Sequence, residues 1–464
     1  MTTKWISDWL NLKPIFYNER TLEISYNIND IINYSNIEFH PEGLLNYLEF
    51  GYSVFGQTPL KNIKFLKPCS ELSVVNGKFL IKKLKDPADQ LFHNKKSSAK
   101  EVINLIKNDI NNWASHQEKE IILPLSGGLD SRMMAILTKD KKKLSCFTYG
   151  GSSQQKKSYE VIRAKNLCKK YKIKWSRIDL NNYLEYMKEW SELFGISTHA
   201  HGMYQMEFYE KIKKKGYQQN GLLSGIIADG FAGSIPKLKI NSYKDISKLG
   251  HSHGLNANPK YCKLKTNYKL KKIFYEENKK KLESWSYQNI STLRLKMILL
   301  SFLFKIPEHY GFNPYSPFID EKIAIKMLNL PIFDRQNRKW QKSFVKKSGE
   351  NTNKNPFIMS FRNNLGYQVL KNFKFEKLNH NLLTDLFEVE YIKNINKELS
   401  SYSIKDKILE FIFSTPRIGR LITSKLKLDN KKLSAYNAYL TIKPIQDILI
   451  KSKKIKTKQN GKDI

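Results

Sequence analysis

The sequence has few of the features that define several common protein classes. Its 464 residues include four cysteines, Cys69, Cys146, Cys168 and Cys262, and none of them has the CxxC spacing of a zinc or redox motif. The sequence therefore supports neither a disulfide framework nor a structural zinc site. No apolar run approaches the ~18 residues that span a bilayer. The longest candidate, MILLSFLF at 297–304, is typical of a buried helix.

The opening stretch of the sequence does not have the pattern of a signal peptide. The opening stretch, MTTKWISDWLNLKP, has neither an apolar centre nor a small-residue cleavage site. Together with the lack of a membrane-spanning run, this predicts a cytoplasmic protein that makes no contact with membranes.

Arginine is scarce, although the chain is strongly basic. The formal charge is +37, yet only ten of the 80 basic residues are arginine, and the others are lysines scattered along the chain. Specific recognition of bases and phosphates favours the planar guanidinium of arginine, whereas scattered lysines are typical of a solvated surface. We expect no specific nucleic-acid partner, and any RNA binding should be weak and steeply salt-dependent.

The hydrophobic patterns divide the chain into four parts. Residues 1–95 contain short aromatic and alternating segments, including a hairpin candidate around Asn76-Gly77, and should form a small, mostly β domain. Residues 96–350 begin with a helical pattern, and four strands, IILPL, LSCFTYG, IKWSRIDL and GLLSG, then alternate with helices. Residues 351–450 read as a helical extension, and the basic tail 451–464 as disordered.

This alternation predicts an α/β fold with a parallel sheet. In such a sheet the loops at the carboxyl ends of the strands form the ligand crevice. Two polar segments, SGGLDS and IIADG, follow strands and should therefore meet at this edge.

The loop SGGLDS after IILPL has the properties of an anion-binding site. Gly127 and Gly128 let backbone N–H groups approach one point, and the helix that begins near Asp130 directs its positive end there. Ser126 and Ser131 add hydroxyl donors. The charge of Asp130 would repel a bare polyphosphate but suits one that carries Mg²⁺. No lysine follows, so this is not the GxxxxGK[ST] loop.

SGGLDS after an apolar strand resembles the pyrophosphate-binding loop of the ATP pyrophosphatases. Four further segments narrow the resemblance to their asparagine synthetase-like branch, and a fifth, at 47–72, resembles the end of its amino-terminal domain. The four are CFTYG, the helix with Glu160, Ala164 and Leu167, SGIIADGFAG with Asp229 on the acidic position, and SPFID at 316–320.

The resemblance implies a sheet of the adenine nucleotide alpha hydrolase-like (PP-loop, HUP) type and an amide ligase. Such an enzyme uses ATP to adenylate a carboxylate, releases pyrophosphate, and passes the acyl group to ammonia or an amine. The implied metal is Mg²⁺, bound by Asp130 and Asp229, and the implied catalytic lysine is Lys339 or Lys342. The implied nucleotide contacts are Leu125, Ser126, Gly127, Gly128, Asp130, Ser131, Thr148, Tyr149, Gly150 and Gly225.

The sequence departs from the family pattern at three places. Ile227 replaces a glycine and Gly230 a glutamate beside Asp229. Thr2 stands where the family has its glutamine-splitting cysteine, and the amino-terminal region is shorter than a complete glutaminase domain. We therefore expect no glutamine hydrolysis, and nitrogen should come from ammonia, from an amine on the substrate, or from a separate amidase.

Other interpretations remain open. A transfer-RNA-modifying enzyme of the lysidine synthetase type carries a similar loop, and for it the basic charge would be an RNA track. An inactive paralogue that acts only as a binding partner is a third reading. Asp229 would then be an ordinary helix N-cap, and Glu160 would complement a helix dipole. His199 and His201 lack a third ligand at metal spacing, which favours a loop or core role. The acyl substrate and the amine are not identified by the sequence.

Overall fold

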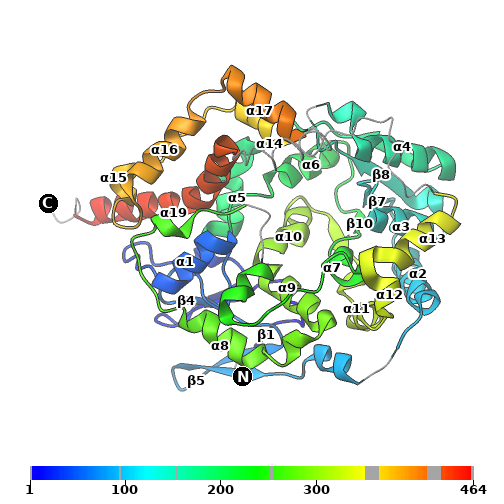
Figure 1. The fold of residues 1–464 in the computed structure, drawn as a ribbon, viewed down its shortest axis with the longest axis horizontal. Helices are drawn as coiled ribbons and strands as arrows, with labels where there is room; N and C mark the ends of the chain where they lie inside the picture. The colour runs from blue at the N-terminus through cyan, green and yellow to red at the C-terminus, as the bar shows by residue number, and fades with distance from the viewer. Residues whose placement is uncertain are drawn as a thin grey trace.

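The computed structural model describes residues 3–93, 96–152, 154–250, 255–350, 365–414 and 430–460. Thr2 lies outside these residues. Figure 1 shows the amino-terminal elements beside the carboxy-terminal helices, with the central sheet on the opposite side of the molecule.

The central sheet has five parallel strands in the order β11, β10, β7, β8, β9. The strands are β7 (Ile121–Pro124), β8 (Leu144–Thr148), β9 (Lys174–Arg177), β10 (Gly221–Leu223) and β11 (Asn313–Tyr315). Strands β8 and β10 are buried along their whole length, as expected for a sheet that helices cover on both faces. The α/β fold with a parallel sheet is confirmed, and all four strands predicted from 121 onward are present.

Helices connect these strands as the alternation predicted. They are α2 (Ala99–Ser115), α3 (Leu129–Leu137), α4 (Tyr159–Tyr171), α5 (Met187–Phe194), α6 (Met203–Lys213) and α7 (Ala228–Ala232). The hydroxyl of Ser98 accepts from the backbone N–H of Glu101 at 3.2 Å, which caps α2. Between β10 and β11 the chain also forms α8 (Lys269–Asn278), α9 (Trp285–Leu300) and α10 (Phe302–His309).

The amino-terminal region contains two small antiparallel sheets and one helix, α1 (Pro41–Phe50). The sheets are formed by β1 (Trp5–Ile6), β5 (Ser70–Val75) and β6 (Lys78–Lys83), and by β3 (Ile24–Ser25), β2 (Phe16–Asn18) and β4 (Ile63–Phe65). Asn76 and Gly77 turn the β5–β6 hairpin with φ of 49° and 69°. Two positive φ values are what a two-residue type I′ turn requires, so the predicted hairpin is confirmed.

The carboxy-terminal part is helical. It comprises α11 (Glu321–Leu328), α12 (Ile332–Arg335), α13 (Lys339–Lys347), α14 (Leu365–Asn372), α15 (His380–Leu383), α16 (Val389–Leu399), α17 (Ile404–Ser414) and α19 (Lys431–Asn460). The prediction of a disordered tail from 451 is wrong for residues 451–460, which form the end of α19. Lysine is a good helix former, and the buried Ile442, Ile445 and Ile448 fix the preceding turns.

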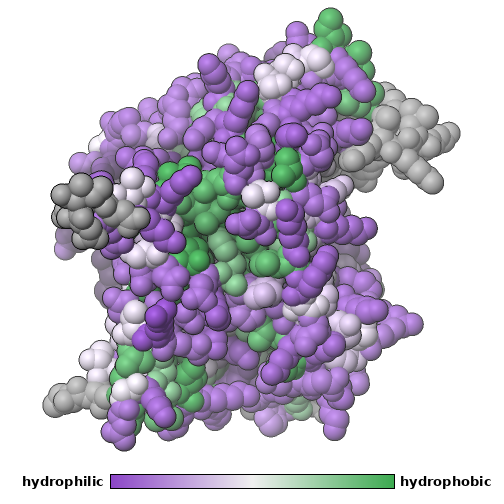
Figure 2. All heavy atoms as spheres, turned by 90° about the vertical axis from the view of Figure 1, so that its left-hand side faces the viewer, coloured by the Kyte–Doolittle hydropathy of each residue, from purple (hydrophilic) through white to green (hydrophobic). Residues whose placement is uncertain are grey.

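One continuous hydrophobic core joins these parts. It extends from Leu10 near the amino terminus, through Ile122 in the central sheet, to Ile448 on α19. The hydroxyl of Tyr47 on α1 donates to the carbonyl of Thr441 on α19 at 2.9 Å. The face of the molecule in Figure 2 is mostly hydrophilic, and hydrophobic residues are visible between the polar ones. Among the described helices, none combines the length and the apolar character needed to cross a bilayer.

Candidate active site

A cavity of about 360 Å³ lies at the carboxyl ends of β7, β8 and β10. Parallel strands place their following loops at one edge, and this edge brings SGGLDS and SGIIADG together. The predicted site residues that line the cavity are Leu125, Ser126, Asp130, Ser131, Thr148, Tyr149, Gly225 and Asp229. Glu160, in the first turn of α4, lines it as well.

The loop that ends β7 is held by hydrogen bonds within itself. The hydroxyls of Ser126 and Ser131 lie 3.1 Å apart, and the Ser131 hydroxyl also accepts from the backbone N–H of Ser126 at 3.2 Å. Helix α3 begins at Leu129, and its N-cap residue Gly128 has no side chain to bond the first-turn N–H groups. These N–H groups and the positive end of the helix suit an anionic ligand.

Gly127, Gly128 and Gly150 do not line the cavity, and two of them have a packing role instead. Gly127 has φ of +66°, and a Cβ there would lie 2.9 Å from Cβ of Arg163 on α4. A Cβ at Gly150 would lie 2.4 Å from the hydroxyl oxygen of Ser158. These glycines let the loops pack closely against the start of α4.

Asp130 is bound by two side chains that its sequence context did not reveal. Nη1 and Nη2 of Arg338 donate to its Oδ2 at 3.3 and 2.8 Å, and Nε2 of Gln341 donates to its Oδ1 at 2.9 Å. Burial raises the pKa of the Asp130 carboxyl above its usual value, with a further contribution from the charge of Asp229, although Arg338 acts in the opposite direction. At Asp130 the effect of burial therefore outweighs that of the bound Arg338.

Asp229 approaches Asp130 because Gly225 lets the two loops touch. A Cβ at Gly225 would lie 2.9 Å from Cβ of Asp130, so any larger residue would push the loops apart. Asp229 lies in the first turn of α7, whose N-cap Ile227 has φ of +61°. A β-branched residue is strained in this region, and Ile227 is the position at which the family pattern has glycine. Ile227 therefore adopts a backbone conformation that glycine would adopt without strain.

Neither predicted catalytic lysine lines the cavity. Lys339 and Lys342 are exposed on α13, and Nζ of Lys339 lies 3.1 Å from the ring centroid of Phe333. A different lysine, Lys296 on α9, interacts with the charge of Asp229. Burial lowers the pKa of Lys296, while Asp229 acts to raise it. Sequence reasoning missed both Lys296 and Arg338.

An aromatic wall from α6 closes one side of the cavity. The ring centroid of Tyr149 lies 5.2 Å from that of Phe208 and 5.8 Å from that of Tyr204. Tyr209 and Gln205 complete the wall. Oε1 of Gln205 is buried and has no hydrogen-bond partner among the described residues. Such an acceptor is costly unless a ligand satisfies it.

The donor set fits a magnesium ion that arrives with phosphates. Among the described residues, no group of three or more His, Cys, Asp or Glu side chains could hold a metal alone. Mg²⁺ is usually bound by one or two carboxylates together with substrate phosphates, and Asp130 and Asp229 supply that number.

His199 is fully buried, which lowers its pKa, as does the neighbouring His201. It lies outside the cavity lining.

Comparison with known proteins agrees with this geometry. A family model described as asparagine synthase matches residues 114–379. The matched range includes the whole parallel sheet and every residue that lines the cavity. No curated protein sequence matches the chain.

Proposed function

This chain belongs to the asparagine synthase family, and from that premise we propose that it is a carbon–nitrogen ligase that forms an acyl-adenylate. Membership makes it an ATP-dependent enzyme of the ligase or amidotransferase type. We further propose that the bond between the α-phosphorus and the bridging oxygen of ATP is broken, and that pyrophosphate leaves. The observation that carries it is that Asp130 and Asp229 line one cavity at the ends of β7 and β10, with Arg338 bound to Asp130.

The proposed reaction has two balanced steps. An oxygen of the substrate carboxylate attacks the α-phosphorus of ATP, the bond to the bridging oxygen breaks, and pyrophosphate leaves. The nitrogen of ammonia or an amine then attacks the acyl carbon, the bond to the adenylate oxygen breaks, and AMP and one proton leave. Positioning and electrostatic stabilisation do most of the work in phosphorus chemistry, which suits a site built from a fixed loop and charges.

The loop and the paired carboxylates would serve the first step. Ser126, Ser131 and the first N–H groups of α3 would bind the phosphate oxygens. Asp130 and Asp229 would hold Mg²⁺, which neutralises phosphate charge when bound. Arg338, which donates to Asp130, would lie where its guanidinium could bind oxygens of the departing pyrophosphate.

Several cationic side chains are candidates for a role in the second step, the attack of nitrogen on the acyl carbon. Lys339 and Lys342 remain the candidates from sequence, but their side chains are exposed outside the cavity. Lys296 is half-buried and interacts with Asp229. Lys296 and Arg338 do not line the cavity themselves, but each interacts with one of its two aspartates, so we favour them for stabilising negative charge as it develops.

Tyr149, Tyr209 and Gln205 would contact the nucleotide base or the acyl group. The unsatisfied Oε1 of Gln205 would suit a ligand group that donates a hydrogen bond, such as an amine or hydroxyl group. The nitrogen donor would be ammonia, an amine on the substrate, or ammonia from a separate amidase.

The test has a binding stage and a chemical stage. Calorimetry should detect ATP binding that requires Mg²⁺ and is lost in the double variant Asp130→Asn, Asp229→Asn. A panel of amino, sugar and peptide carboxylates with ammonium is then screened for AMP and pyrophosphate. Formation of ADP and phosphate in place of AMP and pyrophosphate would overturn the proposed step while leaving ATP dependence intact.

A further inference from the structure

A second and larger cavity, of about 790 Å³, lies away from the candidate active site. It is formed by the segment 256–261, helix α16 and the beginning of α19. No described residue lines both cavities. In Figure 1, α16 and α19 lie on the opposite side of the molecule from β7, β8 and β10. A ligand in this cavity would therefore not take part directly in the ATP chemistry.

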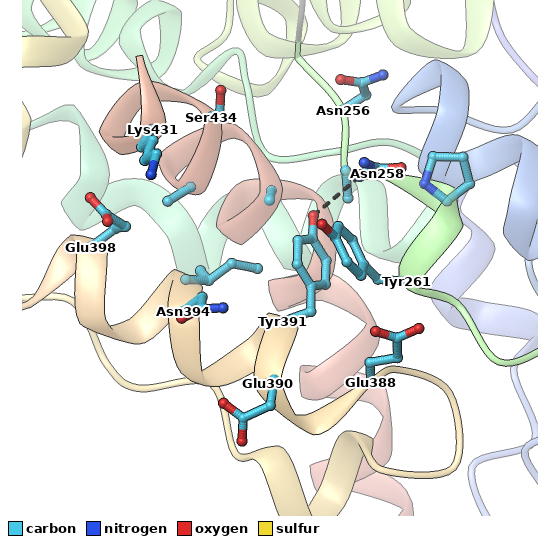
Figure 3. Close-up of a pocket in the computed structure, with 15 residues that line it drawn as sticks. Asn256, Asn258, Tyr261, Glu388, Glu390, Tyr391, Asn394, Glu398, Lys431 and Ser434 are labelled. Carbon is cyan, nitrogen blue, oxygen red and sulfur yellow. Dashed lines mark hydrogen bonds between the residues drawn. The ribbon is translucent and has the colours of Figure 1, made fainter. Parts of the chain in front are cut away.

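The floor of this cavity is apolar and one wall is aromatic. Buried Ala257, Ile395, Ala435 and Ala438 contribute to the floor, and the alanines leave room for a ligand. The rings of Tyr261 and Tyr391 are stacked, with centroids 4.2 Å apart and an interplanar angle of 17°. Figure 3 shows this pair in the middle of the lining side chains.

The tyrosine pair is fixed in place by the backbone. The Tyr391 hydroxyl accepts from the backbone N–H of Asn258 at 3.1 Å, as the dashed line in Figure 3 marks. The backbone N–H of Glu388 donates to the carbonyl of Tyr261 at 3.0 Å. These bonds join segment 256–261 to the start of α16, so the aromatic wall is preformed. A preformed wall lowers the entropy cost of binding.

The charge of the lining is opposite to that of the whole protein. Among the described lining residues there are three carboxylates, Glu388, Glu390 and Glu398, and one cation, Lys431, in a chain with a formal charge of +37. Glu390 is paired with Lys393 at 2.9 Å. Glu388 and Glu398 form no ion pair within the described part of the chain. Lys431 likewise forms none with the three lining carboxylates.

Glu398 adds its charge where a helix end is already negative. It lies in the last turn of α16, and the carbonyl groups at a helix C-terminus carry partial negative charge, which favours cations. Nζ of Lys432 donates to the backbone carbonyl of Glu398 at 2.5 Å and pairs with Asp406 at 3.4 Å. Glu398 itself lines the cavity.

We propose that this cavity binds an organic cation, namely a primary ammonium or guanidinium group on an apolar stem. The stem would lie over the alanines and Ile395, and the charged group would be placed between Glu398 and the tyrosine faces. Carboxylates attract such a group directly, and aromatic faces attract it through their quadrupole. An anion is disfavoured by the same charges.

The probe is hexylammonium, compared with neutral hexan-1-ol on the full-length protein by isothermal titration calorimetry. We expect hexylammonium to bind at least about fivefold more tightly than the alcohol, because one charge-assisted contact contributes on the order of 1 kcal/mol. Glu398→Gln should remove most of this difference, and Tyr391→Leu should weaken hexylammonium about threefold. Lys431→Gln should strengthen its binding.

Asp385→Asn is the matched control, because Asp385 is exposed and does not line the cavity. It removes the same charge three residues from Glu388 and should leave binding unchanged. Equal binding of the amine and the alcohol would overturn the proposal, as would equal weakening by Asp385→Asn and Glu398→Gln. Binding of ATP is measured on the same variants and should not change, so this outcome is independent of the proposed ligase activity.

Discussion

Two aspartate–arginine pairs lie in different regions of this molecule and have different geometries. In the amino-terminal region, Nη1 and Nη2 of Arg294 donate to separate oxygens of Asp86 at 2.7 and 2.6 Å, and the backbone N–H of Ala88 adds a bond at 2.9 Å. At the candidate active site, both Nη atoms of Arg338 share one oxygen of Asp130, at 3.3 and 2.8 Å. The first pair is bidentate and the second is not.

The pKa values of the two aspartates are shifted in opposite directions. Burial raises the pKa of each carboxyl, but at Asp86 the hydrogen bonds and charge of Arg294 outweigh it, and the pKa lies below its usual value. At Asp130 burial outweighs Arg338, and the charge of Asp229 acts with it. We infer that the first pair joins the amino-terminal region to α9, whereas Asp130 would still gain from a further cation.

The largest effect should come from Asp130→Asn, which tests whether the Asp130–Arg338 pair serves activity. The amide keeps the volume but gives up the anionic ligand that a hard cation prefers. We expect pyrophosphate release to fall by about 100- to 1000-fold. The free energy of unfolding should fall less than in Asp86→Asn, because relief of the repulsion from Asp229 offsets part of the cost of leaving Arg338 without its counter-ion.

Pyrophosphate release and urea unfolding are measured on the same preparation of each variant. Asp385→Asn is the control, because it removes one negative charge at the surface. Wild-type rates in Asp130→Asn would break the assignment of this carboxylate to the reaction.

Asp86→Asn should have the complementary effect on stability. It leaves the buried guanidinium of Arg294 without its counter-ion, and breaking a buried pair in this way costs about 3 kcal/mol. The rate of pyrophosphate release per folded molecule should stay near the wild-type value, because Asp86 does not line the active-site cavity. Urea unfolding followed by tyrosine and tryptophan fluorescence measures the first quantity. Equal stability of variant and wild type would contradict a joining role for this pair.

A smaller effect is expected for Arg338→Lys. Lysine keeps the charge but lacks the planar fork that can bind two oxygens, so kcat/KM should fall about tenfold. Arg177→Lys is the control, because Arg177 forms an exposed pair with Asp179 through two bonds of 2.7 and 2.8 Å. A loss shared by both variants would mean that the effect is not specific to the site.

The structure separates what sequence could predict from what it could not. Asn76-Gly77 specified the β5–β6 hairpin because a tight turn depends on adjacent residues. Asp130 and Asp229 could be placed at one sheet edge because each directly follows a parallel strand. Arg338 lies 208 residues after Asp130, and its contact depends on how α13 packs against α3. No local pattern encodes such a contact.

The second cavity was not predicted for the same reason. Its lining comes from three segments, near 256, 390 and 435, that share no motif. The end of α19 was also missed, since a lysine-rich sequence does not reveal whether a preceding buried helix will continue through it. Local chemistry thus predicted the ends of strands and the tight turn, while contacts between distant helices required the structure.

The smallest expected effect is on acid stability, where the two aspartates should act with opposite signs. The pKa of Asp86 is lower in the folded protein than its usual value of 3.8, so the pair stabilises the fold above about pH 4. That contribution is lost as the pH falls through the folded pKa. For Asp130 the folded pKa is raised, so its charged form weakens the fold at neutral pH and protonation relieves this on acidification. Unfolding free energies of wild type, Asp86→Asn and Asp130→Asn are compared between pH 7 and pH 3. The wild-type value should fall more steeply than that of Asp86→Asn, and less steeply than that of Asp130→Asn. If both variants shift the slope in the same direction, the two pairs are not electrostatic opposites, and their geometries alone distinguish them.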